Sequence, residues 1–88
     1  MAIITVQNQV PLVGTVKYQT SPDNKTMTQT VPASKDRKNG EVRTSKDVLQ
    51  DSEMTVTISG KTKKATYDGA RILFIAVHGQ QDWKLEWH

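Results

Sequence analysis

The chain has 88 residues, of which 35% are hydrophobic and none is Cys, and its 12 Lys and Arg against 9 Asp and Glu give a net charge of +3. A chain of this length forms one small hydrophobic core, so we expect a single domain over residues 1–88. The lack of Cys excludes disulfides, thiolate nucleophiles and cysteine-ligated zinc sites, and the modest positive charge favours polyanionic partners only mildly.

The N-terminal residues and the apolar runs predict neither a secretory nor a membrane-spanning segment. Residues 1–4 carry no basic stretch followed by a long apolar one, which a signal peptide requires. The longest apolar run, Ile72 to Val77, has six residues, whereas a bilayer span needs about 20. We therefore expect a cytoplasmic protein that does not engage a membrane.

The first part of the chain has the two-residue apolar period that is typical of half-buried strands. One apolar face begins at the N-terminus, and a second continues through Gly14 with Thr15 and Lys17 on the opposite side. The members of the two faces are Ala2, Ile4 and Val6, followed by Val10, Leu12, Val16 and Tyr18.

Residues 32–47 are predicted to form a basic hairpin or loop. Asn39-Gly40 is a strong signal for a two-residue hairpin turn, because both positions of such a turn need a positive φ. Pairing about this turn brings together residues of opposite charge, which stabilise a ladder. The two pairs are Lys38 with Glu41 and Asp36 with Arg43.

The outer part of this hairpin has a competing interpretation. Its register continues to Val31 opposite Val48, although Pro32 lacks an N–H and interrupts the ladder or confines it to a sheet edge. Alternatively, Thr44 caps at most one short helical turn near residues 45–50. The sequence leaves both alternatives open.

Apolar and polar residues alternate more clearly in the second half of the chain. Met54, Val56 and Ile58 form one half-buried strand, and Ser59-Gly60 is predicted to close a hairpin after it. Asp68-Gly69 has the same turn chemistry and predicts a hairpin that pairs Ala65 with Ile72.

The last two predicted strands differ in character. Ile72 to Val77 is apolar on both faces, which is typical of a central strand covered on both sides or of a strand inside a small closed barrel. Trp83, Leu85 and Trp87 share one face of a strand at the C-terminus. The predicted fold is therefore all-β, with six or seven short antiparallel strands in a barrel or sandwich.

Ser59-Gly60-Lys61-Thr62 resembles the end of a phosphate-binding P-loop only superficially. The P-loop needs a Gly five residues before Gly60, where this chain has Thr55, and a helix after the Lys-Thr pair, where this chain predicts a strand. We therefore reject nucleotide hydrolysis.

The basic residues offer one candidate site. They either form solvated hairpins that protect sheet edges or contact a phosphate backbone while an aromatic ring stacks on a base. The candidate nucleic-acid residues are Lys35, Arg37, Lys38, Arg43, Lys46, Lys61, Lys63, Lys64 and Tyr67.

The C-terminal aromatic face offers a second candidate site. Two Trp on one face of a terminal strand require burial, in the domain's own core, in a partner or subunit interface, or against a base. Trp83, Leu85 and Trp87 are therefore the candidate protein-interface residues.

No residue pattern indicates an enzyme. His78 and His88 are isolated from acidic clusters, so we expect no metal site and no cofactor. No nucleophile motif is present, and a chain this short offers little depth for a substrate pocket.

We therefore predict a non-enzymatic protein-interaction module, such as a small inhibitor, accessory or assembly subunit of the kind that phages and mobile elements encode. It acts on a protein partner, or on a second copy in a homo-oligomer, through an edge strand or the aromatic strand. The alternative is a small nucleic-acid-binding β-barrel that contacts phosphates through its basic hairpins.

Overall fold

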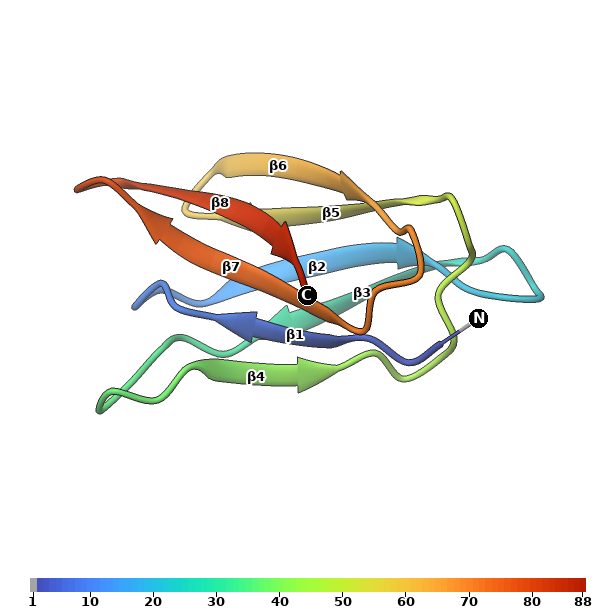
Figure 1. Ribbon diagram of the computed structural model, residues 1–88, viewed down its shortest axis with the longest axis horizontal. Helices are drawn as coiled ribbons and strands as arrows, with labels where there is room; N and C mark the ends of the chain where they lie inside the picture. The colour runs from blue at the N-terminus through green and yellow to red at the C-terminus, as the bar shows by residue number, and fades with distance from the viewer. Residues whose placement is uncertain (1) are drawn as a thin grey trace.

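The computed structural model describes residues 2–88 and forms two four-stranded β-sheets (Figure 1). The described residues contain no helix, which confirms the all-β prediction. The strands are eight rather than six or seven: β1 (Thr5–Asn8), β2 (Gly14–Gln19), β3 (Thr26–Val31), β4 (Gly40–Arg43), β5 (Glu53–Ile58), β6 (Lys61–Thr66), β7 (Ile72–His78) and β8 (Asp82–Trp87).

The chain passes repeatedly between the two sheets. The first sheet has the order β4-β1-β7-β8, and the second has the order β3-β2-β5-β6. All pairs are antiparallel except β1 and β7, which run parallel with Val6 opposite Leu73. The order of strands is therefore set by pairing between distant parts of the chain and only partly by local hairpins.

One hydrophobic core is shared by both sheets. Val6, Leu73 and Ile75 enter it from the first sheet, and Val16 and Val56 enter it from the second. In β2 and β5 the core side chains alternate with polar ones, because successive residues of a strand point to opposite faces. In β7 the residues between Leu73 and Ile75 and on either side of them are apolar as well. The two-residue period of the sequence is thus confirmed as the in-and-out pattern of the core.

The predicted hairpin at Asn39-Gly40 is wrong, because the turn lies three residues earlier. Asp36 and Arg37 are the two residues with positive φ, at 54° and 65°, and backbone hydrogen bonds in both directions between Lys35 and Lys38 close the turn. Gly40 instead begins β4, where a Cβ would clash with the carbonyl of Pro32. Here the glycine permits close packing of two segments.

The predicted charge pairs across that hairpin are also absent from the ladder. Glu41 lies opposite Gln7 and Arg43 lies opposite Thr5, because β4 pairs with β1. β3 pairs with β2 in the other sheet, so Val31 lies opposite Gly14.

The hairpin predicted at Asp68-Gly69 is wrong as well. Ala65 lies opposite Met54 in the second sheet, whereas Ile72 lies opposite Thr5 in the first. The Asp68 carboxylate accepts a hydrogen bond from the backbone N–H of Ala70, so this segment does turn, but it carries the chain from one sheet to the other.

The turn at Ser59-Gly60 is confirmed as a hairpin. Both residues have positive φ, at 52° and 80°, and Ile58 lies opposite Lys61. A strand follows this turn where a P-loop has its helix. Between β4 and β5, residues 44–52 form no helical turn; Val48 makes isolated bridges with Ala2 and Thr20 instead.

Candidate functional site

Four chain connections meet at one end of the molecule (Figure 1). They join β1 to β2, β3 to β4, β5 to β6 and β7 to β8, and we call this the loop end. It consists of residues 9–13, 32–39, 59–60 and 79–81. The other connections, residues 20–25, 44–52 and 67–71, form the opposite end.

Exposed apolar side chains gather at the loop end. Leu12, Val13 and Val77 are 50%, 59% and 53% exposed, and they are the exposed large hydrophobic residues of the part of the chain that the structure describes. Leu12 and Val77 both line the same cavity. Single exposed apolar residues are ordinary on protein surfaces, but a group of them at one place makes the loop end a candidate site.

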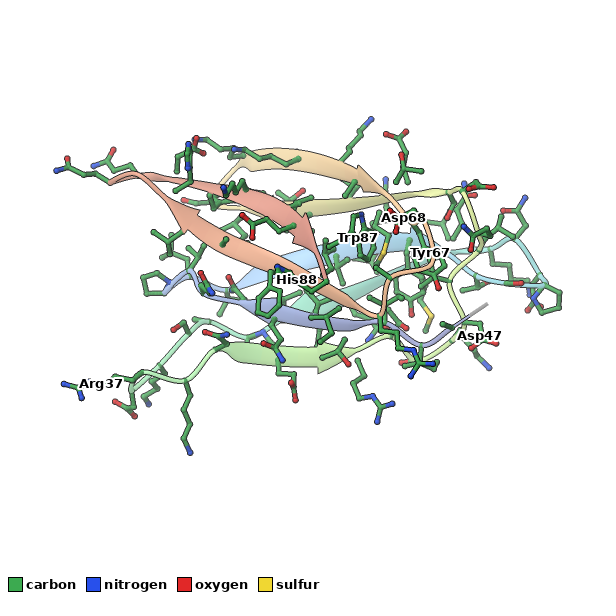
Figure 2. The ribbon with its side chains drawn as sticks, in the orientation of Figure 1. Arg37, Asp47, Tyr67, Asp68, Trp87 and His88 are labelled. Atoms are coloured by element: carbon green, nitrogen blue, oxygen red, sulfur yellow. The ribbon has the colours of Figure 1, made fainter. Side chains whose placement is uncertain are left out.

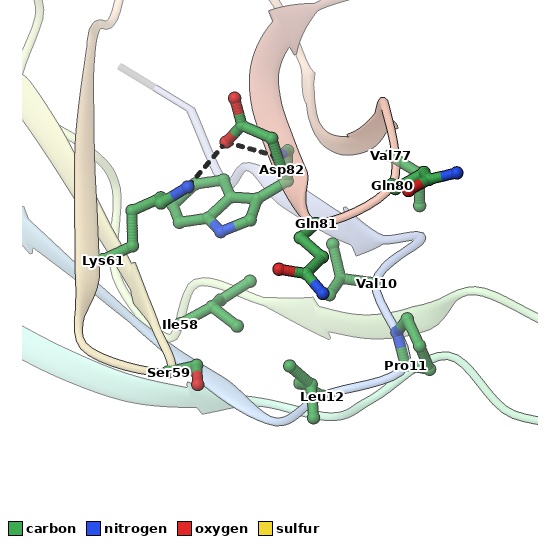
Figure 3. A pocket seen from close by; sticks show the side chains of 11 residues that line it. Val10, Pro11, Leu12, Ile58, Ser59, Lys61, Val77, Gln80, Gln81 and Asp82 are labelled. Atoms are coloured by element: carbon green, nitrogen blue, oxygen red, sulfur yellow. Dashed lines mark hydrogen bonds and ion pairs between the residues drawn. The ribbon is translucent and has the colours of Figure 1, made fainter.

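The cavity lies between the two sheets at this end and has a volume of about 390 Å³ (Figure 3). Its apolar lining includes three core residues, Val10, Ile58 and Trp83, together with the exposed Leu12 and Val77. Its polar lining is Ser59, Lys61, Gln80, Gln81 and Asp82. An apolar hollow with a polar rim is suited to an apolar side chain attached to a polar backbone.

Asn8, at the end of β1, holds the walls of this cavity in place. Its side chain is fully buried, and its Oδ1 accepts a hydrogen bond of 2.9 Å from the N–H of Val10. Its Nδ2 donates to the carbonyls of Leu12 and Pro32, both at 3.0 Å. One buried amide thus ties the apolar connection 9–13 to the connection between β3 and β4.

An ion cluster borders the cavity where β6 meets β8. Lys63 Nζ lies 2.9 Å and Lys61 Nζ lies 3.1 Å from the Asp82 carboxylate. The hydrogen bond from Lys63, the N–H of Trp83 and the hydrogen bond from Lys61 hold the pKa of Asp82 well below its ordinary value of 3.8. Lys63 also donates to the carbonyl of Trp83 and lies 5.2 Å from the centroid of its ring.

The C-terminal aromatic face packs on the protein's own core. Trp83 is only 4% exposed, and Leu85 and Trp87 are half-buried against the core. The centroids of the Trp87 and Tyr67 rings are 5.7 Å apart, and Figure 2 shows the two residues next to each other. A protein-interface role for this face remains a prediction, and Leu85 and Trp87 offer most of its accessible surface.

The candidate nucleic-acid residues are spread over several surfaces. Lys35, Arg37 and Lys38 occupy the turn at the loop end, where Figure 2 shows Arg37 at the tip. Arg43 and Lys46 lie toward the opposite end, because β4 runs away from the loop end.

The remaining members of that set are separated in the same way. Lys61 and Lys63 are engaged by Asp82, whereas Lys64 lies opposite Thr55 on the outward face of the second sheet. Tyr67 is 1% exposed, so its ring lies inside the core and is not available to stack on a base. The geometry therefore does not unite these residues into one phosphate-binding surface.

The described residues 2–88 lack two further features. They hold no group of three or more His, Asp or Glu side chains placed to bind a metal ion. They also contain no helix with the length and apolar character of a membrane span.

Two of the predicted site residues, Lys61 and Trp83, line the cavity, but the sequence pattern did not identify its apolar mouth. The two-residue period places Leu12 on an apolar strand face and predicts that Ile72 to Val77 is covered on both faces, whereas Leu12 and Val77 are half-exposed. The one available signal is the run Val10-Pro11-Leu12-Val13, in which consecutive apolar residues cannot all face inward from an alternating strand. The chain matches no protein-family model, no curated protein and no solved structure with which it was compared.

Proposed function

We propose that this chain is a non-enzymatic protein-interaction module that binds a partner protein through its loop end. In this proposal an apolar side chain of the partner enters the cavity between Leu12 and Val77. The proposal depends chiefly on one observation, namely that two of the three exposed large hydrophobic residues of the described chain, Leu12 and Val77, line the same apolar cavity.

The shape and chemistry of the loop end support a protein partner. Interfaces owe most of their binding energy to a few side chains that fill well-packed apolar pockets, with a polar rim that excludes water around them. The cavity has Trp83 and Ile58 among its lining residues and the amides of Gln80 and Gln81 beside them. These amides offer donors and acceptors to the backbone of an incoming segment.

The chemistry at the rim supports binding rather than catalysis. A general acid or base needs a pKa close to the working pH. The lysines beside Asp82 lower the pKa of its carboxyl group, so at neutral pH it is a fixed negative charge that neither donates nor readily accepts a proton.

Binding through an edge strand has less support than binding through the loop end. The edges of the two sheets lie close together and are bridged by side chains. Gln29 of β3 donates to the carbonyl of Arg43 in β4, and Lys63 of β6 donates to the carbonyl of Trp83 in β8. A partner strand would have to displace these contacts before it added to either sheet.

The test is a selection of short random peptides displayed on phage against the intact chain. We expect the selected peptides to bind the unchanged protein and to perturb the amide NMR signals of Leu12, Val77 and Trp83. The variant Leu12→Asp should lose this binding, because it places a charge at the mouth of an apolar cavity. Leu12 is half-exposed, so the variant should keep the unfolding midpoint of the parent.

The matched control is Thr28→Asp, which places the same charge on an exposed position of β3. It should bind the selected peptides as the parent does. The proposal is overturned if no peptide is selected, if the peptides bind the Leu12→Asp variant equally well, or if they perturb residues of the opposite end.

A further inference from the structure

We infer that the segment recognised at the loop end is acidic: its apolar anchor is flanked by Asp or Glu residues that contact the basic turn formed by residues 35–38. This inference rests on the proposed function and adds the chemical class of the partner. It is carried by the position of the turn, by its charge and by the rigidity with which the fold presents it.

The basic turn is attached directly to the wall of the cavity. The N–H of Ser34 donates to the carbonyl of Val10 at 2.9 Å, and the carbonyl of Pro32 accepts from Asn8, which also holds Leu12. The turn begins one residue after Ser34. The turn is therefore within reach of a segment that places an apolar side chain beside Val10.

The turn has charge available for a partner. Residues 32–39 contain three cations, Lys35, Arg37 and Lys38, and one anion, Asp36, so their net charge is +2. Within residues 2–88 the structure shows no ion pair for these three cations, in contrast to Lys61 and Lys63, which pair with Asp82.

The charge is also distributed unevenly over the molecule. The connections of the opposite end, residues 20–25, 44–52 and 67–71, together carry a net charge of −1. A field of this polarity attracts an acidic segment to the loop end and disfavours the same segment at the opposite end. Complementary charge around an apolar anchor mainly governs orientation and the rate of association.

The turn is preorganised rather than an open loop. Its central residues, Asp36 and Arg37, both have the positive φ of a two-residue turn, and two backbone hydrogen bonds join Lys35 to Lys38. Residues directly opposite each other on a ladder project to the same face. Lys35 and Lys38 are such a pair, so both side chains leave the same face of the turn and little ordering of the backbone is needed on binding.

The first readout is the composition of the peptides selected in the experiment above. We expect an apolar or aromatic residue with Asp or Glu enriched on at least one side of it. If peptides are selected that depend on Leu12 but show no enrichment of acidic residues, the inference is overturned and the proposed function stands. If no peptide is selected, both fail.

The second readout is charge reversal. The double variant Lys35→Glu/Lys38→Glu should weaken binding of the strongest selected peptide about tenfold, which corresponds to about 1.4 kcal/mol. The control Lys46→Glu/Lys64→Glu changes the net charge equally but alters positions away from the loop end, and it should leave the affinity unchanged. Equal weakening by both double variants would assign the effect to total charge and overturn the inference.

Salt and lipid complete the test. Raising the salt concentration from about 0.1 M to about 1 M shortens the Debye length from ~10 to ~3 Å, so the difference in peptide affinity between the parent and Lys35→Glu/Lys38→Glu should shrink.

Phosphatidylserine vesicles are the competing anionic surface. If they bind the parent and release the bound peptide, and Leu12→Asp abolishes this binding, the loop end is a membrane-docking surface and the inference is overturned.

Discussion

Asn8 shows how one side chain determines the shape of the candidate site. It is a fully buried polar residue in a chain whose core is otherwise mostly apolar. Its amide bonds to Val10 and Leu12 in the connection that follows it and to Pro32, which is 24 residues away in the sequence. A buried amide is favourable only where its donors and acceptors are all used, and here they hold one wall of the cavity in position.

We expect Asn8→Ala to lower the free energy of unfolding by about 1–3 kcal/mol, because it leaves buried backbone groups without hydrogen-bond partners. Urea denaturation measures this loss, and amide hydrogen exchange at Val10 should accelerate. The matched control is Asn39→Ala, whose side chain is exposed and makes one long contact to Gln7 at 3.4 Å. It should change stability by no more than about 0.5 kcal/mol. Equal stability of the two variants would contradict this account.

At the level of single elements, the sequence predicts strands better than it predicts their partners. The alternation of β5 and β8 identifies both strands, because burial of one face imposes the two-residue period. Ser59-Gly60 identifies a hairpin because its flanking strands pair with each other. Asp68-Gly69 has comparable turn chemistry but joins different sheets, since a turn fixes only the local path of the backbone.

Gly40 illustrates a second limit of sequence patterns. Asn-Gly favours a hairpin turn because both residues tolerate positive φ. In this fold, however, Gly40 is needed because a Cβ would meet the carbonyl of Pro32. A close contact that leaves no room for a Cβ and a backbone with positive φ both favour glycine, and the sequence alone does not show which of the two applies.

The ion cluster between β6 and β8 predicts a pH dependence of stability. The pKa of Asp82 is depressed in the folded chain by Lys63, the N–H of Trp83 and Lys61. A depressed carboxyl pKa stabilises the fold above the ordinary pKa of the unfolded state, 3.8, and this stabilisation is lost as the pH falls toward the folded value. Asp82→Asn should therefore lower the urea midpoint at pH 7, and the difference from the parent should shrink at pH values below that of the unfolded carboxyl.

Asp23→Asn is the control for this measurement, because the described structure shows no ion pair for Asp23. It removes one acidic group at the opposite end and should leave the pH dependence of the midpoint close to that of the parent. A constant difference between Asp82→Asn and the parent from neutral to acidic pH would show that the ion cluster does not stabilise the fold.

At the scale of the whole molecule, the candidate site arises from topology. Its cavity is lined by Val10 and Leu12 from the connection between the sheets, by Val77 and Trp83 from the first sheet, and by Ile58 from the second. These residues are brought together only when distant strands pair. Local periodicity carries no information on such pairing, so it does not distinguish the exposed Leu12 and Val77 from the buried Val10, Ile58 and Trp83.

Because both sheets share one core, we expect them to unfold together as a single cooperative unit. The two Trp residues, Trp83 and Trp87, both lie in β8 and report on the first sheet, whereas amide exchange at Val16 and Val56 reports on the second. In urea, fluorescence and exchange-derived free energies of unfolding should agree for the parent, and they should decrease together in Asn8→Ala. Loss of the second sheet at a lower urea concentration than the first would show that the sheets are separate units, and the cavity between them would then be present only while both are folded.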